Sequence, residues 1–208
     1  MAEWSNSKGV AAFVLKYRLR QQQPGQSNGG GAPAEGGSAR QELTIVKGNA
    51  NPAPGDAVLD EVLRMGIADA QQALRLVRQN AAKWHVDPKR VGMMGFSAGG
   101  GVSVGTVRAN EPGASADFLI SVYGPSLQDV KVPVNAPPLF IAIGSNHFNV
   151  TNGCLALFAE WKKAGKPAEI HVYDQVNAGF AMAKRSVPVD TWPDRLLDWM
   201  QLHKLLHP

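Results

Sequence analysis

The sequence is poor in cysteine, in long apolar stretches and in charge of one sign, and each shortage argues against a class of protein. Its single cysteine, Cys154, excludes an intrachain disulfide and is compatible with a reducing compartment. No stretch approaches the ~18 apolar residues that a membrane-spanning helix needs, so we expect no membrane partner. The 21 basic and 17 acidic residues leave a net charge of +4, with no basic stripe interleaved with aromatics, which argues against nucleic acid.

The sequence also shows neither the residue spacing of a zinc site nor the profile of a signal peptide. No group of His, Cys, Asp and Glu has the spacing of zinc ligands, so we expect no metal ion and no other cofactor. Residues 1–8, MAEWSNSK, lack the basic and then apolar profile of a signal peptide, and a cytoplasmic location is the expectation. A reading frame that continues upstream of Met1 is an open alternative.

The length and composition are those of one ordinary globular domain, residues 1–208, with 44% hydrophobic and 18% charged residues. One region departs from this composition. Residues 21–56 are rich in Gly and Pro and hold too few apolar side chains to order themselves, which predicts a mobile excursion. Within it, residues 42–47 (ELTIVK) could form a short edge strand or hairpin arm.

Apolar runs and periodic segments alternate along the rest of the chain. The run at 9–18 (GVAAFVLKYR) is typical of a strand buried on both faces. The further predicted strands are 90–94, 117–123, 138–144 and 168–173, and the predicted helices are 67–84, 98–109, 152–164 and 190–205. Strands that alternate with helices predict an α/β fold with a mostly parallel sheet. Asp69 then lies in a first helical turn, and Cys154 is a buried helical side chain.

The most informative motif is Gly-Phe-Ser-Ala-Gly at 95–99, between a predicted strand and a predicted helix. A G-x-S-x-G sequence in that setting describes a nucleophile elbow, a turn so sharp that the Ser97 hydroxyl projects above the sheet edge. Small residues at 95, 98 and 99 allow the strand and the helix to approach closely. The alternative interpretation is a glycine-rich turn with an idle serine.

The order of these segments resembles the esterase and lipase branch of the α/β-hydrolase superfamily, especially the acetylxylan-esterase-like and carboxylesterase-like enzymes. The resemblance is carried by GVAAFVLKYRL, by DAQQALRLVRQNAAKWHVDPKRVGMMGFSAGG, by PPLFIAIG, and by AGKPAEIHVY with GFAM. It implies an eight-stranded, mostly parallel sheet and cleavage of short-chain carboxylic esters by a Ser-His-Asp triad.

Three departures from that family pattern bear on the chemistry. The strands that precede residues 9–18 in relatives, and the HGGG-type loop that supplies half of the oxyanion hole, have no counterpart, which leaves the Ala98 N–H as the expected donor. The position of the triad acid, aligned on Val150, holds His147. The position of the histidine base holds Ala178, within Val-Asn-Ala-Gly-Phe at 176–180.

These departures suggest a relocated base. The His147 side chain is longer than an aspartate, and Ala178 vacates the space of an imidazole, so we hypothesise a Ser97–His147 dyad in which His147 takes the serine proton. The sequence therefore favours an esterase that acts on small-molecule esters through an acyl-enzyme on Ser97. One alternative is a catalytically impaired hydrolase-fold protein that binds a small ligand or a partner, and another is a lactone hydrolase.

The missing strands also carry a prediction about assembly. If the remaining strands pair in sequence order, right-handed crossovers place all connecting helices on one face of the sheet. The other face would then expose a large apolar patch that the predicted C-terminal helix covers only in part. We therefore expect a homo-oligomer.

Overall fold

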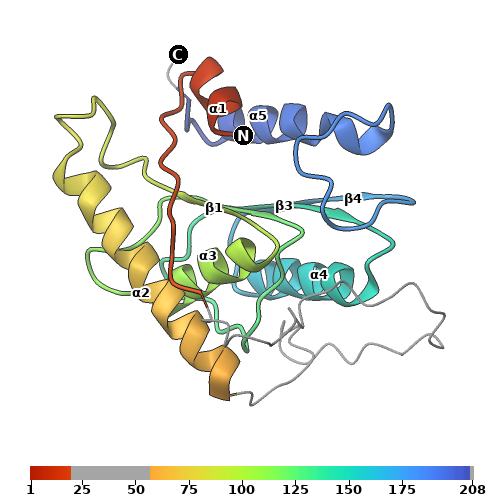
Figure 1. The fold of residues 1–208 in the computed structure, drawn as a ribbon, viewed down its shortest axis with the longest axis horizontal. Coiled ribbons are helices and arrows are strands. Elements are labelled where there is room, and N and C mark those ends of the chain that lie inside the picture. Colours follow the sequence, from red (N-terminus) through yellow and green to blue (C-terminus); the bar gives the residue numbers. More distant parts are fainter. Residues whose placement is uncertain (20–56, 207–208) are drawn as a thin grey trace, which may run out of the picture.

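The computed structural model describes residues 1–19 and 57–206, and these ranges build helices around a parallel sheet (Figure 1). The predicted excursion at 21–56 and the short strand at 42–47 lie outside the described residues. In chain order, the elements are α1 (Ala2–Ser7), α2 (Ala57–Gln79), β1 (Met93–Phe96), α3 (Ala98–Ala109), β2 (Leu119–Val122), β3 (Leu139–Gly144), α4 (Phe148–Lys163), β4 (Ala168–Tyr173), a 3-10 turn (Pro188–Thr191) and α5 (Trp192–Leu202).

The sheet of the described residues has four parallel strands in the order β1-β2-β3-β4. The central strands β2 and β3 are buried at every position, as expected of a parallel sheet that is covered on both faces. Because the strands are parallel, the segments that follow β1, β3 and β4 all leave at one edge of the sheet. That edge carries Ser97, His147 and Ala178.

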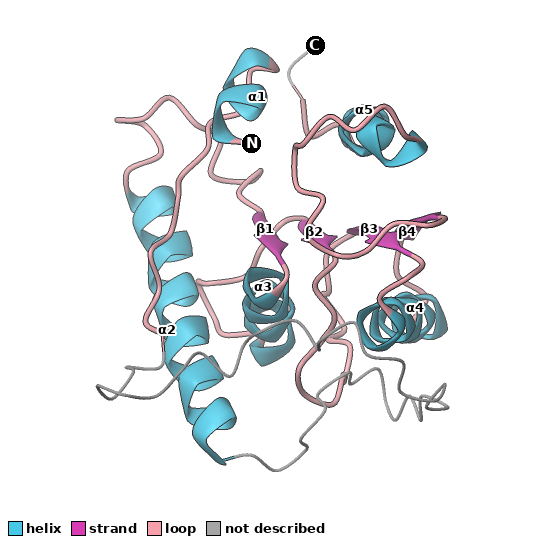
Figure 2. Cartoon of the chain, turned by 45° about the vertical axis from the view of Figure 1, so that its right-hand side comes forward, coloured by secondary structure: helices cyan, strands magenta, loops and turns pink. Residues whose placement is uncertain are grey.

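Helices cover both faces of this sheet. Figure 1 and Figure 2 place α3 and α4 on one face and α1 and α5 on the other, and α2 packs beside α3. The two crossover helices thus share a face, as predicted. The predicted exposed patch on the other face is wrong for the described residues, because α5 buries Trp192, Leu196 and Trp199 against the core. The exposed face therefore no longer supports a homo-oligomer, which stays a prediction.

The apolar run at 9–18 is not the buried strand that the sequence predicts. The described part of this segment has no strand pairing, and Val14 is 87% exposed. The segment instead runs beside α2, where Arg18 pairs with Asp69 (Figure 1). The Phe13 ring packs 4.9 Å from the ring of Trp84, which follows the end of α2. A strand needs a neighbouring strand to satisfy its backbone N–H and C=O groups. Among the described residues, β1 pairs only with β2, so residues 9–18 do not extend the sheet on the other side of β1.

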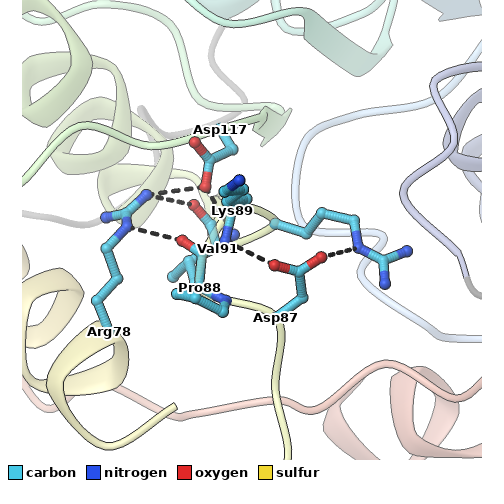
Figure 3. A network of polar contacts seen from close by, with 7 residues as sticks. Arg78, Asp87, Pro88, Lys89, Val91 and Asp117 are labelled. Atoms are coloured by element: carbon cyan, nitrogen blue, oxygen red, sulfur yellow. Dashed lines mark hydrogen bonds and ion pairs between the residues drawn. The ribbon is translucent and has the colours of Figure 1, made fainter. Parts of the chain in front are cut away.

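A polar network fixes the amino ends of β1 and β2, opposite the edge that holds Ser97 (Figure 3). Arg78 of α2 donates to the Asp117 carboxylate at 2.8 Å and to the Pro88 carbonyl at 3.1 Å. The same carboxylate accepts the Val91 N–H at 2.8 Å. Because side-chain oxygens and backbone groups satisfy each other here, α2 and the two strands are held in one arrangement, and β1 enters the sheet at a defined position.

Candidate active site

Ser97 forms a strained turn between a strand and a helix. β1 ends at Phe96 and α3 begins at Ala98, so Ser97 alone reverses the chain, with φ 49° and ψ −122°. A positive φ is uncommon for a residue other than glycine, and it clusters at functional sites. The Ser97 N–H donates to the Val122 carbonyl at 3.1 Å, and the Ser97 carbonyl accepts the Gly100 N–H at 2.9 Å. The backbone of the turn is thus fixed while the side chain is exposed to solvent.

Close backbone contacts make this turn possible, and glycine permits each of them. A Cβ at Gly95 would lie 2.1 Å from the Gly99 carbonyl oxygen, where no atom can fit. A Cβ at Gly100 would lie 2.7 Å from the Gly124 Cα, and one at Gly124 would lie 2.7 Å from the Ser97 carbonyl oxygen. The sequence pattern indicates a small residue at 95 but gives no signal at 100 and 124, because the approach between α3 and the segment after β2 is a long-range contact without a local pattern.

The first N–H of α3 is available to a ligand. Among the described residues, the Ala98 N–H donates to no protein acceptor. The first N–H groups of a helix have no partner within it, and they carry the positive end of the helix dipole. An oxyanion that forms on a carbonyl attacked by Ser97 can accept this N–H.

His147 lies at the same edge of the sheet, directly before α4. Its carbonyl accepts the Thr151 N–H at 2.8 Å, and its side chain is half-buried. Within the described part of the chain, no hydrogen bond joins the Ser97 hydroxyl to His147 or to another side chain. The structure places the two residues of the predicted dyad on one edge without bonding them, and the dyad stays a prediction.

Backbone contacts tie the segment of His147 to the segment that follows β4. The Ser145 N–H donates to the Tyr173 carbonyl at 2.8 Å, and the Asn146 N–H donates to the Val176 carbonyl at 3.0 Å. The Ser145 hydroxyl accepts the Gln175 N–H at 3.1 Å. The segments that carry His147 and Ala178 are therefore neighbours at this end of the sheet.

Aromatic rings connect the segment of Ala178 to the elbow. The Phe180 ring lies 4.7 Å from the Tyr123 ring in an edge-on arrangement, and Tyr123 follows the strand whose Val122 carbonyl binds Ser97. The Phe96 ring contacts both Tyr123 at 5.8 Å and Trp192 at 6.1 Å. Such pairs contribute about 0.5–1.5 kcal/mol each beyond their burial. The segment that carries the half-buried Ala178 is therefore anchored by Phe180 to Tyr123, the residue after β2.

Other candidate nucleophiles and acids have structural roles. Cys154 is fully buried in α4, and burial raises the pKa of its thiol. Asp69 does not lie in a first helical turn as predicted, because α2 begins ten residues earlier than the predicted helix, at Ala57. The Asp69 carboxylate instead accepts the Arg18 N–H and guanidinium, which lowers its pKa. Across residues 1–19 and 57–206, no cluster of three or more His, Cys, Asp or Glu is placed to hold a metal ion.

Residues 37–202 match the sequence model of the dienelactone hydrolase family. The chain belongs to the dienelactone hydrolase family. Over 102 residues it is 28% identical to an acetylxylan esterase of Xylanibacter ruminicola, and the match spans 49% of this chain but 13% of that protein. This membership places the chain in the esterase branch of the α/β-hydrolases, as the resemblance implied.

Solved structures show the same fold. A bifunctional acetyl ester-xyloside hydrolase from Caldicellulosiruptor lactoaceticus superimposes with a TM-score of 0.67 at 23% identity, over 99% of this chain and 76% of that one. A carboxylesterase from Lactobacillus plantarum gives a TM-score of 0.62 at 18% identity, over 71% and 70% of the two chains. The chain thus has an α/β-hydrolase fold. None of its described helices is long and apolar enough to cross a membrane.

Proposed function

We propose that the chain hydrolyses short-chain carboxylic esters through a covalent acyl-enzyme on Ser97. The observation that carries the proposal is the strained, exposed Ser97 at the start of α3, held by glycine contacts that leave no room for a side chain. Backbone strain of this kind costs about 1–3 kcal/mol, and it persists only where the surrounding structure enforces it. Membership of a family of ester hydrolases supports the same chemistry.

In this proposal Ser97 acts as the nucleophile. Its Oγ attacks the ester carbonyl carbon while its proton passes to the imidazole of His147. The oxygen of the tetrahedral intermediate accepts the Ala98 N–H. The intermediate collapses, the alkoxide leaves with the proton from His147, and the acyl group stays on Ser97. Water then attacks the acyl-enzyme with His147 as the base, which releases the carboxylic acid and the free serine.

His147 is proposed as the base because its segment is bound to the segment of Ala178 and its ring makes no hydrogen bond within the described residues. The proposed role requires a rotation about its side-chain torsions that brings the ring to Ser97. Catalytic hydrogen bonds are often long before substrate binds, so an unbonded pair in the free protein is compatible with this role.

Two alternatives have support of their own. A catalytically impaired protein that binds a small ligand or a partner is favoured by Ala178 at the base position and by the absence of a hydrogen bond at the Ser97 hydroxyl in the described residues. Lactone cleavage is favoured by the family description and uses the same nucleophile. In that reaction the leaving alkoxide stays attached to the acyl group until water releases the hydroxy acid.

The test is hydrolysis of p-nitrophenyl acetate by the chain and by its Ser97→Ala and His147→Ala variants. The proposal expects loss of roughly 10⁴-fold in kcat for both variants, since each removes a member of the proton-transfer pair. Loss with Ser97→Ala alone would retain the nucleophile and reject His147 as the base. Equal background rates for all three proteins would support the catalytically impaired protein instead.

A further inference from the structure

Tyr17 brings a phenol hydroxyl to the start of the helix that carries the elbow. Its Oη lies 3.9 Å from the position that a Cβ would take at Gly99, two residues after Ser97. The Tyr17 ring packs on α2, with its Cδ2 3.2 Å from the corresponding position at Gly66. A larger side chain at Gly66 would press on the ring, and one at Gly99 would approach the hydroxyl.

The backbone next to Tyr17 is held in place by α2. The Arg18 N–H donates to Asp69 at 2.8 Å, and the Arg18 guanidinium donates to the same carboxylate at 2.7 Å and 3.0 Å. Hydrogen bonds to a charged group are stronger than neutral ones, which suits an anchor at a partly exposed site. The segment of residues 10–19 therefore has a defined position beside α2 and α3 although it forms no strand (Figure 2).

The Tyr17 hydroxyl is a donor without a partner among residues 1–19 and 57–206. Among the described residues it makes no hydrogen bond, although the side chain is half-buried. Burial raises the pKa of Tyr17, so the phenol keeps its proton at neutral pH and is available as a donor. Among the described residues, the Tyr17 hydroxyl near Gly99 and the N–H of Ala98, the residue before Gly99, both lack an acceptor, which points to a shared ligand.

We propose that the Tyr17 hydroxyl donates a hydrogen bond, together with the Ala98 N–H, to the oxyanion that forms when Ser97 attacks a carbonyl. This inference rests on the proposed esterase function and adds a second donor to that site. Two preorganised donors aimed at the developing negative charge are the usual means of stabilising a tetrahedral intermediate. The hydroxyl would arrive from the 10–19 segment, far from Ser97 in sequence.

The first test compares Tyr17→Phe with Tyr173→Phe. Both variants remove one hydroxyl from a tyrosine and keep the ring, but Tyr173 lies on β4, three strands away from the elbow. With p-nitrophenyl acetate we expect Tyr17→Phe to lower kcat by roughly 100-fold with little change in KM, since one oxyanion donor typically contributes that factor. Tyr173→Phe should stay within about twofold of the parent chain.

A boronic acid that forms a tetrahedral adduct on Ser97 gives a readout that a merely structural role would not produce. We expect Tyr17→Phe to weaken this inhibitor by about the same factor as it lowers kcat, because both quantities report binding of the tetrahedral oxygen. Unchanged kcat and unchanged inhibitor affinity in a folded Tyr17→Phe variant would overturn the inference. A parent chain without Ser97-dependent turnover would reject the proposed function, and the inference with it.

Replacement of Tyr17 by 3-fluorotyrosine tests the same hydroxyl with almost no change in packing, and it applies even if the phenylalanine variant is unstable. Fluorine lowers the pKa of the phenol, and a phenolate cannot donate. We expect kcat to fall at a lower alkaline pH in the fluorinated protein than in the parent chain. Coincident alkaline limbs would contradict the proposed role.

Discussion

The segments that follow β1 and β3 leave the same edge of the sheet but are built in different ways. The turn at Ser97 is enforced by the backbone, because Gly95, Gly100 and Gly124 allow contacts that no side chain could enter. The turn at His147 has an ordinary negative φ, and its ring makes no hydrogen bond in the described part of the chain. The nucleophile's position thus depends on sterics spread over several elements, whereas a base depends on the identity of one side chain. Such a base can move or disappear through a single substitution.

The largest expected effect comes from breaking the elbow itself. Gly95→Ala would place a Cβ 2.1 Å from the Gly99 carbonyl oxygen, so the strand and the helix must separate. We expect the free energy of unfolding to fall by about 2–3 kcal/mol, as for overpacked cores, and turnover to be lost as well. Urea unfolding and p-nitrophenyl acetate hydrolysis measure the two quantities.

Gly99→Ala is the matched control for this substitution. A Cβ at Gly99 meets only the Tyr17 Oη, at 3.9 Å, and alanine favours a helix over glycine by about 1 kcal/mol. The control should therefore be at least as stable as the parent chain. Equal stability of Gly95→Ala and Gly99→Ala would show that the close contact does not enforce the turn.

His147→Asp combined with Ala178→His gives the site the acid and base that the family resemblance implies. His147→Asp alone removes the proposed base and should lower kcat by roughly 10⁴-fold. Adding Ala178→His restores an imidazole on the segment whose Phe180 ring packs against Tyr123, with a carboxylate at 147 to orient it. We expect the double variant to recover most of the activity in an assay with p-nitrophenyl acetate.

The activity of the double variant is compared with that of His147→Asp alone. If the double variant is as inactive as His147→Asp, the segments after β3 and β4 do not present their side chains to Ser97 as proposed. In that case Ser97 would have no base from the segments after β3 and β4. Recovery in the double variant would show that the base depends on the side chains at 147 and 178 and not on the backbone of these segments.

The sequence predicts the local parts of this fold well. The helix at 98–109 and the strand at 168–173 are found with the predicted bounds, because periodicity and flanking residues within each segment define them. The elbow at Ser97 is predicted for the same reason. The helix predicted over 152–164 begins four residues earlier, directly after His147, and such boundaries are the least certain part of a sequence pattern.

What the sequence could not predict depends on distant neighbours. The apolar run at 9–18 has the composition of a buried strand, but among the described residues no strand pairs with it, and Val14 is exposed. Gly124 is needed because α3 crosses close to it, which no local pattern reveals. The Tyr17 hydroxyl, unbonded among the described residues, is likewise brought near Gly99 by packing of its ring on Gly66 of α2.

The smallest expected effect concerns the segment that follows Ala178. The Asp190 carboxylate accepts the N–H groups of Arg185 and Ser186 at 2.7 Å and 2.8 Å, and these bonds lower its pKa. A carboxyl with a lower pKa in the folded state stabilises the fold above its ordinary pKa, and this stabilisation is lost as the pH falls through the folded value. Asp190→Asn should therefore be less stable than the parent chain at pH 7, with a difference that shrinks towards pH 3.

Urea unfolding of both proteins at the two pH values measures this effect. A stability difference that stays constant with pH would show that the charge of Asp190 does not order the segment. The glycine contacts of the elbow include no titrating group, so a substitution there should change the stability by an amount that does not depend on pH. The destabilisation caused by Gly95→Ala should be the same at both pH values.

The central claim is that Ser97 is an activated nucleophile, and covalent labelling tests it most directly. The folded chain is treated with a fluorophosphonate ester, digested, and analysed by mass spectrometry for the phosphonyl adduct on the peptide that contains Ser97. The account predicts an adduct on Ser97, none in Ser97→Ala, and a slower reaction in His147→Ala. A folded chain that carries no adduct on Ser97 would contradict it.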